Sequence, residues 1–443
     1  MKILKILCSC IVAAIVLIFG IKPALAFCGF YVAKADSSLY NQASQVVIAR
    51  DNNRTVLTMS NDYQGEVKDF AMVVPVPVIL KEEQVHIGSS KIIDRLDSFS
   101  APRLVEYFDP DPCQPMAVME DRAFSNMPQA ASRNRQLEKA ESLGVTIEEQ
   151  FSVGEYDILI LSAEESDGLE TWLIQNGYKI PQGASELLQP YIRQDLKFFV
   201  AKVNLEEFDN SGFEKLRPIS IAYESPKFML PIRLGMMNAN GDQDLFVYLL
   251  SPKGQIELTN YRTVKIPSDT DVPEFVQQAF KEFYTAMFDE SYQRENKQVA
   301  FLEYAWDMAS CDPCSADPLN QQELKEAGVF WLDRNNSNPR FGGSNVFITR
   351  LHVRYTRDKF PEDLKFQATS DRSLFQGRYV IRHPFREKLT CDAGEDYLQS
   401  VRDRQEREAQ NLANLTGWEI GSIRDRIKFV EGESIPWWRN VWN

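Results

Sequence analysis

In the stretch SCDPCSADP, Cys311 and Cys314 have a spacing at which thiols do chemistry. A Cys-x-Pro-Cys pair can shuttle electrons, because a thiolate at a helix N-terminus has a lowered pKa. The same spacing can supply two of the four ligands of a zinc ion, or it can tie a turn that opens with Asp-Pro. The surrounding sequence has to decide among these three interpretations.

The sequence does not place the further ligands that a zinc site or a haem site would need. The three histidines, His86, His352 and His383, are far apart in the sequence, whereas a structural zinc usually takes a second close pair of ligands. Haem attachment needs a histidine directly after Cys314, and Ser315 is in that place. We therefore expect no metal and no cofactor.

A redox-active dithiol is less well supported than a structural turn. A thioredoxin-like site needs a strand before the dithiol and a helix after it, whereas VAFLEYAWDM (299–308) reads as a helix and Pro318 interrupts the segment after Cys314. Asp-Pro-Cys also recurs at 111–113 without a second cysteine. A thiol–disulfide oxidoreductase using Cys311 and Cys314 remains the leading alternative.

The structural interpretation predicts disulfides that close separate parts of the chain. Exported thiols usually pair, although the five of the seven cysteines that follow residue 26 leave at least one over. We expect Cys28 to pair with Cys113, and Cys391 to pair with Cys311 or Cys314. The spacing alone does not fix this connectivity.

Residues 1–26 have the pattern of a cleaved secretory signal. Two lysines precede the continuous apolar run 6–21, and Ala24 and Ala26 supply small residues before a cut at Phe27. The run is too short to be a comfortable membrane-spanning helix. We expect export to the periplasm or the extracellular space, without stable membrane insertion after cleavage.

The balance of charge limits the partners. The chain has 63 acidic and 49 basic residues, a formal net charge of −14, and loss of the three lysines in the signal lowers it to −17. Such a chain repels nucleic acid and anionic lipid. The partners that remain are another exported protein, or an anionic ligand at a local group of cations.

Two segments share an order of features that indicates a duplication. VLTMSNDYQGEVKDFAMVVPVP (56–77) and IRLGMMNANGDQDLFVYLLSP (232–252) each run through an apolar strand, an Asn, a Gly and an Asp to an apolar run ending at Pro. Each half is predicted to be a β-meander followed by a helix. The first half covers 27–118, and the second ends at 314.

The remaining segments complete an α+β prediction. Residues 119–150 are polar and read as a linker or a helical insertion, and 151–314 begins with a βααβ unit before the second half. The region 315–443 has two strands and a long helix over 394–415. Strands and helices in no regular βαβ order favour the α+β class.

Five cationic or near-cationic side chains gather on the two strands of the C-terminal region. Period-two alternation places three of them on one face of VFITRLHVRYT and two on one face of GRYVIRH. They are Arg350, His352, Arg354, Arg378 and Arg382. On adjacent strands they would form an anion-binding surface, since guanidinium groups match carboxylates and phosphates. The alternative is that they neutralise the chain's own acidic residues, for example Asp358.

Six ordered motifs resemble one known family. FCGFYVAKA, DFAMVVPVP, NGYKIPQGASELLQPYI, MLPIRLG, EYAW…CDPC and ITRLHVRY…PEDLKF are similar to the signatures of the domain of unknown function 2330. The likeness covers nearly the whole chain after the signal. It implies an exported bacterial protein, and it implies no reaction, substrate or catalytic residue. Relatives often carry a second cysteine shortly after Cys-Gly, where this chain has Tyr31 and Val32.

These observations favour a non-catalytic exported binding or structural module. The motifs of serine hydrolases, zinc proteases and P-loop proteins are absent from the sequence. A carbohydrate-active enzyme needs only two carboxylates, for which Asp109 and Asp111 are one candidate pair. A solvated acidic loop is the simpler interpretation of that pair.

Overall fold

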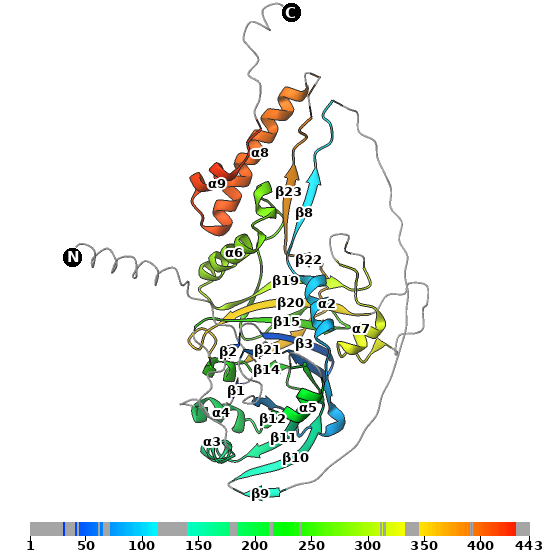
Figure 1. Ribbon diagram of the computed structural model, residues 1–443, viewed down its shortest axis with the longest axis vertical. Coiled ribbons are helices and arrows are strands. Elements are labelled where there is room, and N and C mark those ends of the chain that lie inside the picture. Colours follow the sequence, from blue (N-terminus) through cyan, green and yellow to red (C-terminus); the bar gives the residue numbers. More distant parts are fainter. Residues whose placement is uncertain are drawn as a thin grey trace, which may run out of the picture.

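The computed structural model confirms the α+β class. It describes residues 30–31, 40–41, 44–60, 63–64, 71–113, 140–142, 144–176, 184–211, 216–238, 241–310, 312, 316–332, 345–387, 389, 391 and 393–430. Two sheets stacked face to face make the body of the protein, and helices cover their outer faces (Figure 1). A projection made of strands and helices extends from one end of this body (Figure 1).

A nine-stranded sheet, called the large sheet here, forms the centre. Along its main path the order is β17 (Arg262–Lys265), β19 (Val299–Asp307), β20 (Phe347–Tyr355), β15 (Gln243–Ser251), β3 (Ser44–Asp51), β4 (Arg54–Ser60), β13 (Ile219–Glu224) and β7 (Val85–Ile87). The short strand β22 (Phe375–Gln376) pairs with β19 off this path. The pairs β15–β3 and β17–β19 are parallel, and the other pairs are antiparallel. The centre of the sheet therefore joins segments that are far apart in the sequence.

A six-stranded sheet, the small sheet, packs against the large one. Its order is β1 (Phe30–Tyr31), β6 (Ala71–Val76), β12 (Lys197–Val203), β11 (Tyr156–Ala163), β10 (Val145–Val153) and β9 (Ala140–Ser142). Helices α3 (Ser166–Gln175) and α4 (Ala184–Ile192) connect β11 to β12, which confirms the predicted βααβ unit. Side chains such as Ile48, Met72 and Ile158 form the buried core between the two sheets.

The outer face of each sheet is covered by helices. Leu169, Trp172 and Leu188 from α3 and α4 pack on the small sheet. On the large sheet, α2 (Ser90–Ser100) and α7 (Gln321–Glu326) bury a second cluster, and α6 (Phe280–Arg294) buries another beside β19. The body therefore has the layer order helix, small sheet, large sheet, helix.

The projection is called the arm. It consists of β18 (Thr270–Asp271), β23 (Arg378–His383) and β8 (Arg103–Phe108), paired in that order and all parallel, with α8 (Ala393–Thr416) and α9 (Ile420–Arg426) alongside. The 3-10 helix η4 (Glu274–Gln277) lies near β23. The arm is at one end of the long axis, and the small sheet is at the other (Figure 1).

Smaller elements complete the part of the chain that is described. A three-stranded sheet joins β14 (Met229–Leu230), β21 (Leu364–Ala368) and β16 (Ile256–Leu258), and β2 (Tyr40–Asn41) pairs with β5 (Tyr63–Gln64). The remaining elements are α5 (Leu205–Ser211), η2 (Glu82–Gln84) and η3 (Leu234–Asn238).

Several predicted elements differ from the observed ones. The segment 299–308 is largely the strand β19 rather than a helix, because its long apolar run lies buried within a sheet covered on both faces. The predicted meanders are split between sheets: β6 pairs with β12 in the small sheet, whereas β3 and β4 form a hairpin in the large one. From Ala140 onward, the predicted polar insertion 119–150 forms β9 and the start of β10.

Candidate functional site

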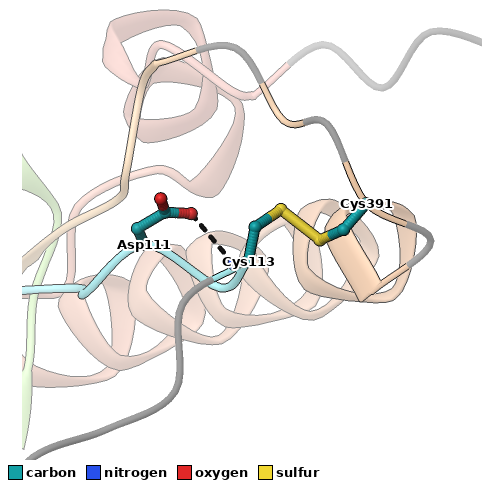
Figure 2. Close-up of a disulfide and its surroundings, with 3 residues drawn as sticks. All are labelled: Asp111, Cys113 and Cys391. Carbon is teal, nitrogen blue, oxygen red and sulfur yellow. Dashed lines mark hydrogen bonds between the residues drawn. A yellow bond between two sulfur atoms is a disulfide. The ribbon is translucent and has the colours of Figure 1, made fainter.

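A disulfide between Cys113 and Cys391 closes the arm (Figure 2). The two residues are 278 positions apart in the sequence, and their Cα atoms are 5.7 Å apart. The predicted pairing of Cys28 with Cys113 is therefore wrong, and so is the pairing of Cys391 with Cys311 or Cys314. The reason is topological, because β8 and β23 are parallel neighbours whose C-terminal ends lie at the same side. Cys113, shortly after β8, and Cys391, shortly after β23, are therefore brought together.

Cys28, Cys311 and Cys314, the other three cysteines after residue 26, lie outside the described residues. Asp312, between the last two, is buried, and its carboxylate accepts hydrogen bonds from the Tyr304 hydroxyl (2.9 Å) and the Gln376 amide (2.7 Å). The strand β19 before this segment satisfies one of the two requirements of a thioredoxin-like dithiol. Residues 316–320 have no helical structure, so they do not supply the second requirement.

The three cationic residues of β20 lie in a buried chain of alternating charges. Arg350 donates to Asp97 on α2 (2.7 Å) and, through Nε, to Glu303 on β19 (2.6 Å). The two ring nitrogens of His352 lie 2.9 Å from the Glu303 carboxylate and 3.0 Å from that of Asp244 on β15. On the opposite strand face, Phe347, Leu351, Val353 and Tyr355 pack in the core between the sheets, as the alternation predicts.

Arg354 continues the chain of charges towards α6. Its Nε and Nη2 donate to the two oxygens of Asp244 at 2.7 and 2.8 Å, and its Nη1 donates to Asp289 on α6. The Tyr284 hydroxyl, also on α6, donates to Glu303. The chain thus ties α2 and α6 to the middle of the large sheet.

Burial and ion pairing have opposite effects on the ionisation of the side chains in this chain of charges. Burial opposes the charge of His352, but the carboxylates of Glu303 and Asp244 outweigh it and raise the histidine pKa. Burial likewise opposes the charge of Glu303, yet Arg350 and His352 lower its pKa to about 2. Pairing therefore favours the charged form of both side chains, and Glu303 is fully buried.

The two remaining predicted cations lie on a different sheet. Arg378 donates to Asp269 at 2.5 Å, and Arg382 donates to Asp271 at 3.0 Å, both across to the segment of β18. The structure therefore does not place the five side chains on one surface, and each of them contacts a carboxylate of the chain itself. Binding of an external anion by these five residues stays a prediction, and their geometry accounts for internal neutralisation.

Ionic contacts also hold α8 against the strands of the arm. Arg404 on α8 donates to both oxygens of Asp109, at 3.2 and 2.7 Å, and the Tyr397 hydroxyl donates to Asp109 at 2.7 Å. Asp111 instead accepts a hydrogen bond from the backbone of Cys113 at 2.9 Å (Figure 2). Asp109 and Asp111 thus have separate structural partners beside the disulfide.

Glu408 on α8 is an unusual carboxylate in this contact. Its side chain is 4% exposed, and its Oε1 lies 3.5 Å from Nε of Arg404 without forming a hydrogen bond within the described part. Burial raises the pKa of Glu408 to about 7; Arg404 opposes this shift, and the charges of Asp271 and Glu274 support it. The joint between α8 and the strands therefore contains a group that ionises near neutral pH.

The outer edge of the arm is formed by β8. Residues 103–108 pair with β23 on one side, and no other described strand pairs with them. Arg103 N donates to Gly377 O, and Asp109 N donates to His383 O. Since successive residues of a strand direct their backbone groups to opposite sides, those of Leu104, Glu106 and Phe108 point to the open edge.

Aromatic side chains accompany this edge. Six large apolar side chains of the described residues are exposed, and two of them, Tyr107 (44%) and Phe108 (73%), are neighbours on β8. Phe108 stacks on the ring of His383 with centroids 4.4 Å apart, and the Arg382 guanidinium lies over the Tyr107 ring. These rings are held in place while one side of each stays open to solvent.

The described ranges hold neither a cluster of metal ligands nor an apolar spanning helix. Within them, no group of three or more His, Cys, Asp or Glu side chains is arranged to hold a metal ion. Across those same ranges, no helix combines the length and the apolar character needed to cross a bilayer.

The fold and these contacts define a class: an α+β protein with two stacked sheets and a disulfide-closed arm. The chain belongs to the family described as "Uncharacterized protein conserved in bacteria" (DUF2330), whose model matches residues 22–367. This confirms the resemblance carried by the sequence motifs. The strand β23, helix α8 and Cys391 lie beyond the matched residues. No curated protein and no solved structure matches the chain.

Sequence reasoning found the cations of β20 but not their acidic partners. Glu303, Asp244 and Asp97 come from three different elements, and only the pairing of β15, β19 and β20 brings them together. One signal was present in the sequence: Glu303 is an ionisable residue within an otherwise apolar run. Such a residue indicates a buried partner of opposite charge.

Proposed function

We propose that this chain is an exported, non-catalytic binding protein that recognises an extended segment of another exported protein through the open edge of β8. The single observation that carries the proposal is the combination of outward-facing backbone groups at Leu104, Glu106 and Phe108 with the exposed rings of Tyr107 and Phe108. An added strand forms backbone hydrogen bonds with such an edge, and neighbouring side chains supply specificity.

The contacts that hold the end of β8 support its use as a template for this pairing. The disulfide Cys113–Cys391 and the contacts of Arg404 and Tyr397 with Asp109 fix the chain just after β8. A strand that is already ordered loses little conformational entropy on binding. Native proteins usually cover or charge an open edge, because it attracts other strands, so an uncovered aromatic edge suits a binding role.

Charge favours a foreign, basic segment over a second copy of this chain. The sequence has a net charge of −14, so two copies repel each other while a basic partner is attracted. In addition, if the β8 strands of two copies paired antiparallel about Glu106, the two Glu106 carboxylates would lie directly opposite each other. Two like charges in that position are unfavourable.

The test uses random decapeptides displayed on phage as probes. We expect peptides selected on the intact protein to show alternating apolar residues and a net positive charge. The variant Phe108→Pro removes one outward-facing N–H and one exposed ring without removing a bond to β23. We expect it to weaken binding of the selected peptides at least about tenfold, from the loss of one hydrogen bond and one aromatic contact.

A matched control replaces another exposed apolar side chain. Ile174→Ser alters α3 at the far end of the molecule, where Ile174 is 54% exposed, and should leave peptide binding unchanged. Equal binding to the intact protein and to Phe108→Pro would refute the proposal. If light scattering shows a dimer for the intact protein and a monomer for Phe108→Pro, the edge binds a second copy of this chain instead.

Export is part of the same proposal. It is supported by the signal-like residues 1–26 and by the disulfide, because such bonds persist in oxidising compartments. A thiol–disulfide oxidoreductase remains a second candidate, since the strand β19 precedes Cys311. Alkylation of free thiols followed by peptide mapping separates the two: a pair Cys311–Cys314 that cycles readily and reduces insulin supports the oxidoreductase.

A further inference from the structure

One buried guanidinium of the large sheet has no acidic partner. Arg50 and Arg350 are the two arginines that are buried in the described part, with 6% and 4% of their surface exposed. Arg350 contacts the carboxylates of Asp97 and Glu303. For Arg50, no carboxylate of the described residues lies within ion-pairing distance. A buried cation without a counter-charge is unfavourable, because it loses its hydration without gaining an ion pair.

Neutral oxygens satisfy part of this guanidinium. Nη1 donates to the Thr55 hydroxyl (2.6 Å) and to the Lys227 carbonyl (3.4 Å), and Nη2 donates to the Ser225 carbonyl (3.0 Å). The guanidinium carbon also lies 4.6 Å from the centre of the Phe228 ring. Burial lowers the pKa of Arg50, in contrast to that of Arg350.

The donors that remain are the ones that other arginines of this chain use for carboxylates. Nε of Arg50 makes no hydrogen bond with a described residue, and Nη2 makes only one. Arg354 uses Nε and Nη2 together to hold both oxygens of Asp244. Arg217 uses the same two nitrogens for Glu155. Arg50 therefore retains a pair of donors suited to two oxygens of a carboxylate.

A cavity of about 170 Å³ lies beside Arg50. It is formed where the β3–β4 turn, the end of β15 and the end of β21 meet, and its walls include Phe228, Pro252 and Ala368. The cavity is smaller than the ~300–1,000 Å³ of drug-sized ligand sites. It therefore suits a small ligand, or one terminal group of a larger ligand.

The charges that line this cavity are unequal. Arg50 and Lys253 are cationic, and Asp51 is the one acidic residue among the lining residues, so the formal charge is +1. The Asp51 carboxylate accepts a hydrogen bond from the Asn52 amide at 2.9 Å. An excess of one positive charge matches a monoanion better than a phosphate dianion. The apolar wall of Phe228, Pro252 and Ala368 matches a short carbon chain.

We propose that this cavity is a binding site for a small monocarboxylate, with Arg50 holding its two oxygens and Lys253 adding a second positive charge. The site is separate from β8 and extends the proposed function to a second, small-molecule ligand. It also differs from the predicted surface of five cations, since none of those residues lines it.

The experiment measures binding of N-acetylglycine to the full chain by ligand-observed NMR, with N-acetylglycinamide and inorganic phosphate as matched probes. We expect N-acetylglycine to bind, the neutral amide not to bind, and phosphate to bind more weakly. Arg50→Met should weaken N-acetylglycine binding roughly 10- to 100-fold, because charge-assisted hydrogen bonds are the stronger kind.

A second variant keeps the test valid if Arg50→Met does not fold. Lys253→Met leaves Arg50 in place and should weaken binding at least about threefold, with a reduced dependence on salt. Lys227→Met is the control, since its Nζ donates to the Gln194 carbonyl and its side chain does not line the cavity. Equal binding of the acid and the amide would overturn the proposal. So would tighter binding of phosphate, or binding unaffected by Lys253→Met.

Discussion

Neutralising Glu408 should stabilise the arm at and above neutral pH. Glu408 is 3% exposed, and its pKa is raised to about 7 from 4.5. Each pKa unit corresponds to ~1.4 kcal/mol, so the ionised carboxylate costs about 3 kcal/mol once it is fully charged in the folded state. Glu408→Gln has a similar shape and cannot ionise, so it removes this cost.

The sign of the effect follows from the raised pKa. Below pH 4.5 the side chain is protonated whether the arm is folded or unfolded, so the stability linked to its proton is fully present. Between pH 4.5 and about 7 that stability falls, because only the unfolded arm releases the proton freely, and above pH 7 it is lost. The variant should match the intact protein at pH 4 and exceed it by about 3 kcal/mol at pH 8.

Amide hydrogen exchange of α8 measures this difference locally. With both proteins compared at the same pH, α8 should exchange roughly two orders of magnitude more slowly in Glu408→Gln at pH 8, and equally fast at pH 4. Glu406→Gln is the control on the same helix. Glu406 is solvent-exposed, and its hydrogen bond from Arg424 lowers its pKa. Replacing its carboxylate should therefore change the exchange of α8 little. Parallel pH profiles for the intact protein and Glu408→Gln would refute the reasoning.

Three further predictions concern the large sheet, the disulfide and the signal. Arg350→Met should lower the free energy of unfolding in urea by about 3–5 kcal/mol, because it leaves Glu303 buried without its cation; an effect below about 1 kcal/mol would contradict this. Replacing Cys113 and Cys391 together by Ser should destabilise the arm by about 2–4 kcal/mol, measured by faster exchange in α8, and unchanged exchange would show that the disulfide adds nothing. Intact-mass analysis of the exported protein should give a chain that begins at Phe27, and a mass that retains residues 1–26 would contradict cleavage.

Local patterns in the sequence predicted individual elements well. The alternation in β20 placed Leu351 and Val353 in the core and Arg350 and His352 on the opposite face, as observed. The long helix expected over 394–415 is α8, Ala393–Thr416. The face that a side chain takes on a strand and the extent of a helix both depend on neighbouring residues. A single segment of the sequence is therefore enough to predict them.

Properties that depend on pairing between distant segments were not predicted. The strand β19 looked like a helix because a strand buried on both faces loses its alternation. The disulfide partner of Cys113 depends on the pairing of β8 with β23, which no local pattern encodes. Arg50 was not singled out, since its lack of a carboxylate depends on which elements surround it.

The order in which strands pair has a consequence for synthesis. In the large sheet β3 lies beside β15, which lies beside β20, so the centre closes only after residue 355 is made, and the arm closes only after Cys391. At about 5–20 residues per second, Cys391 follows Ser44, the first residue of β3, by roughly 17 to 70 s. The far sides of β4 and β3 stay unpaired until β13 and β15 have been made, at residues 224 and 251. Folding of the large sheet is therefore a late event in synthesis, because its central strands come from distant segments of the chain.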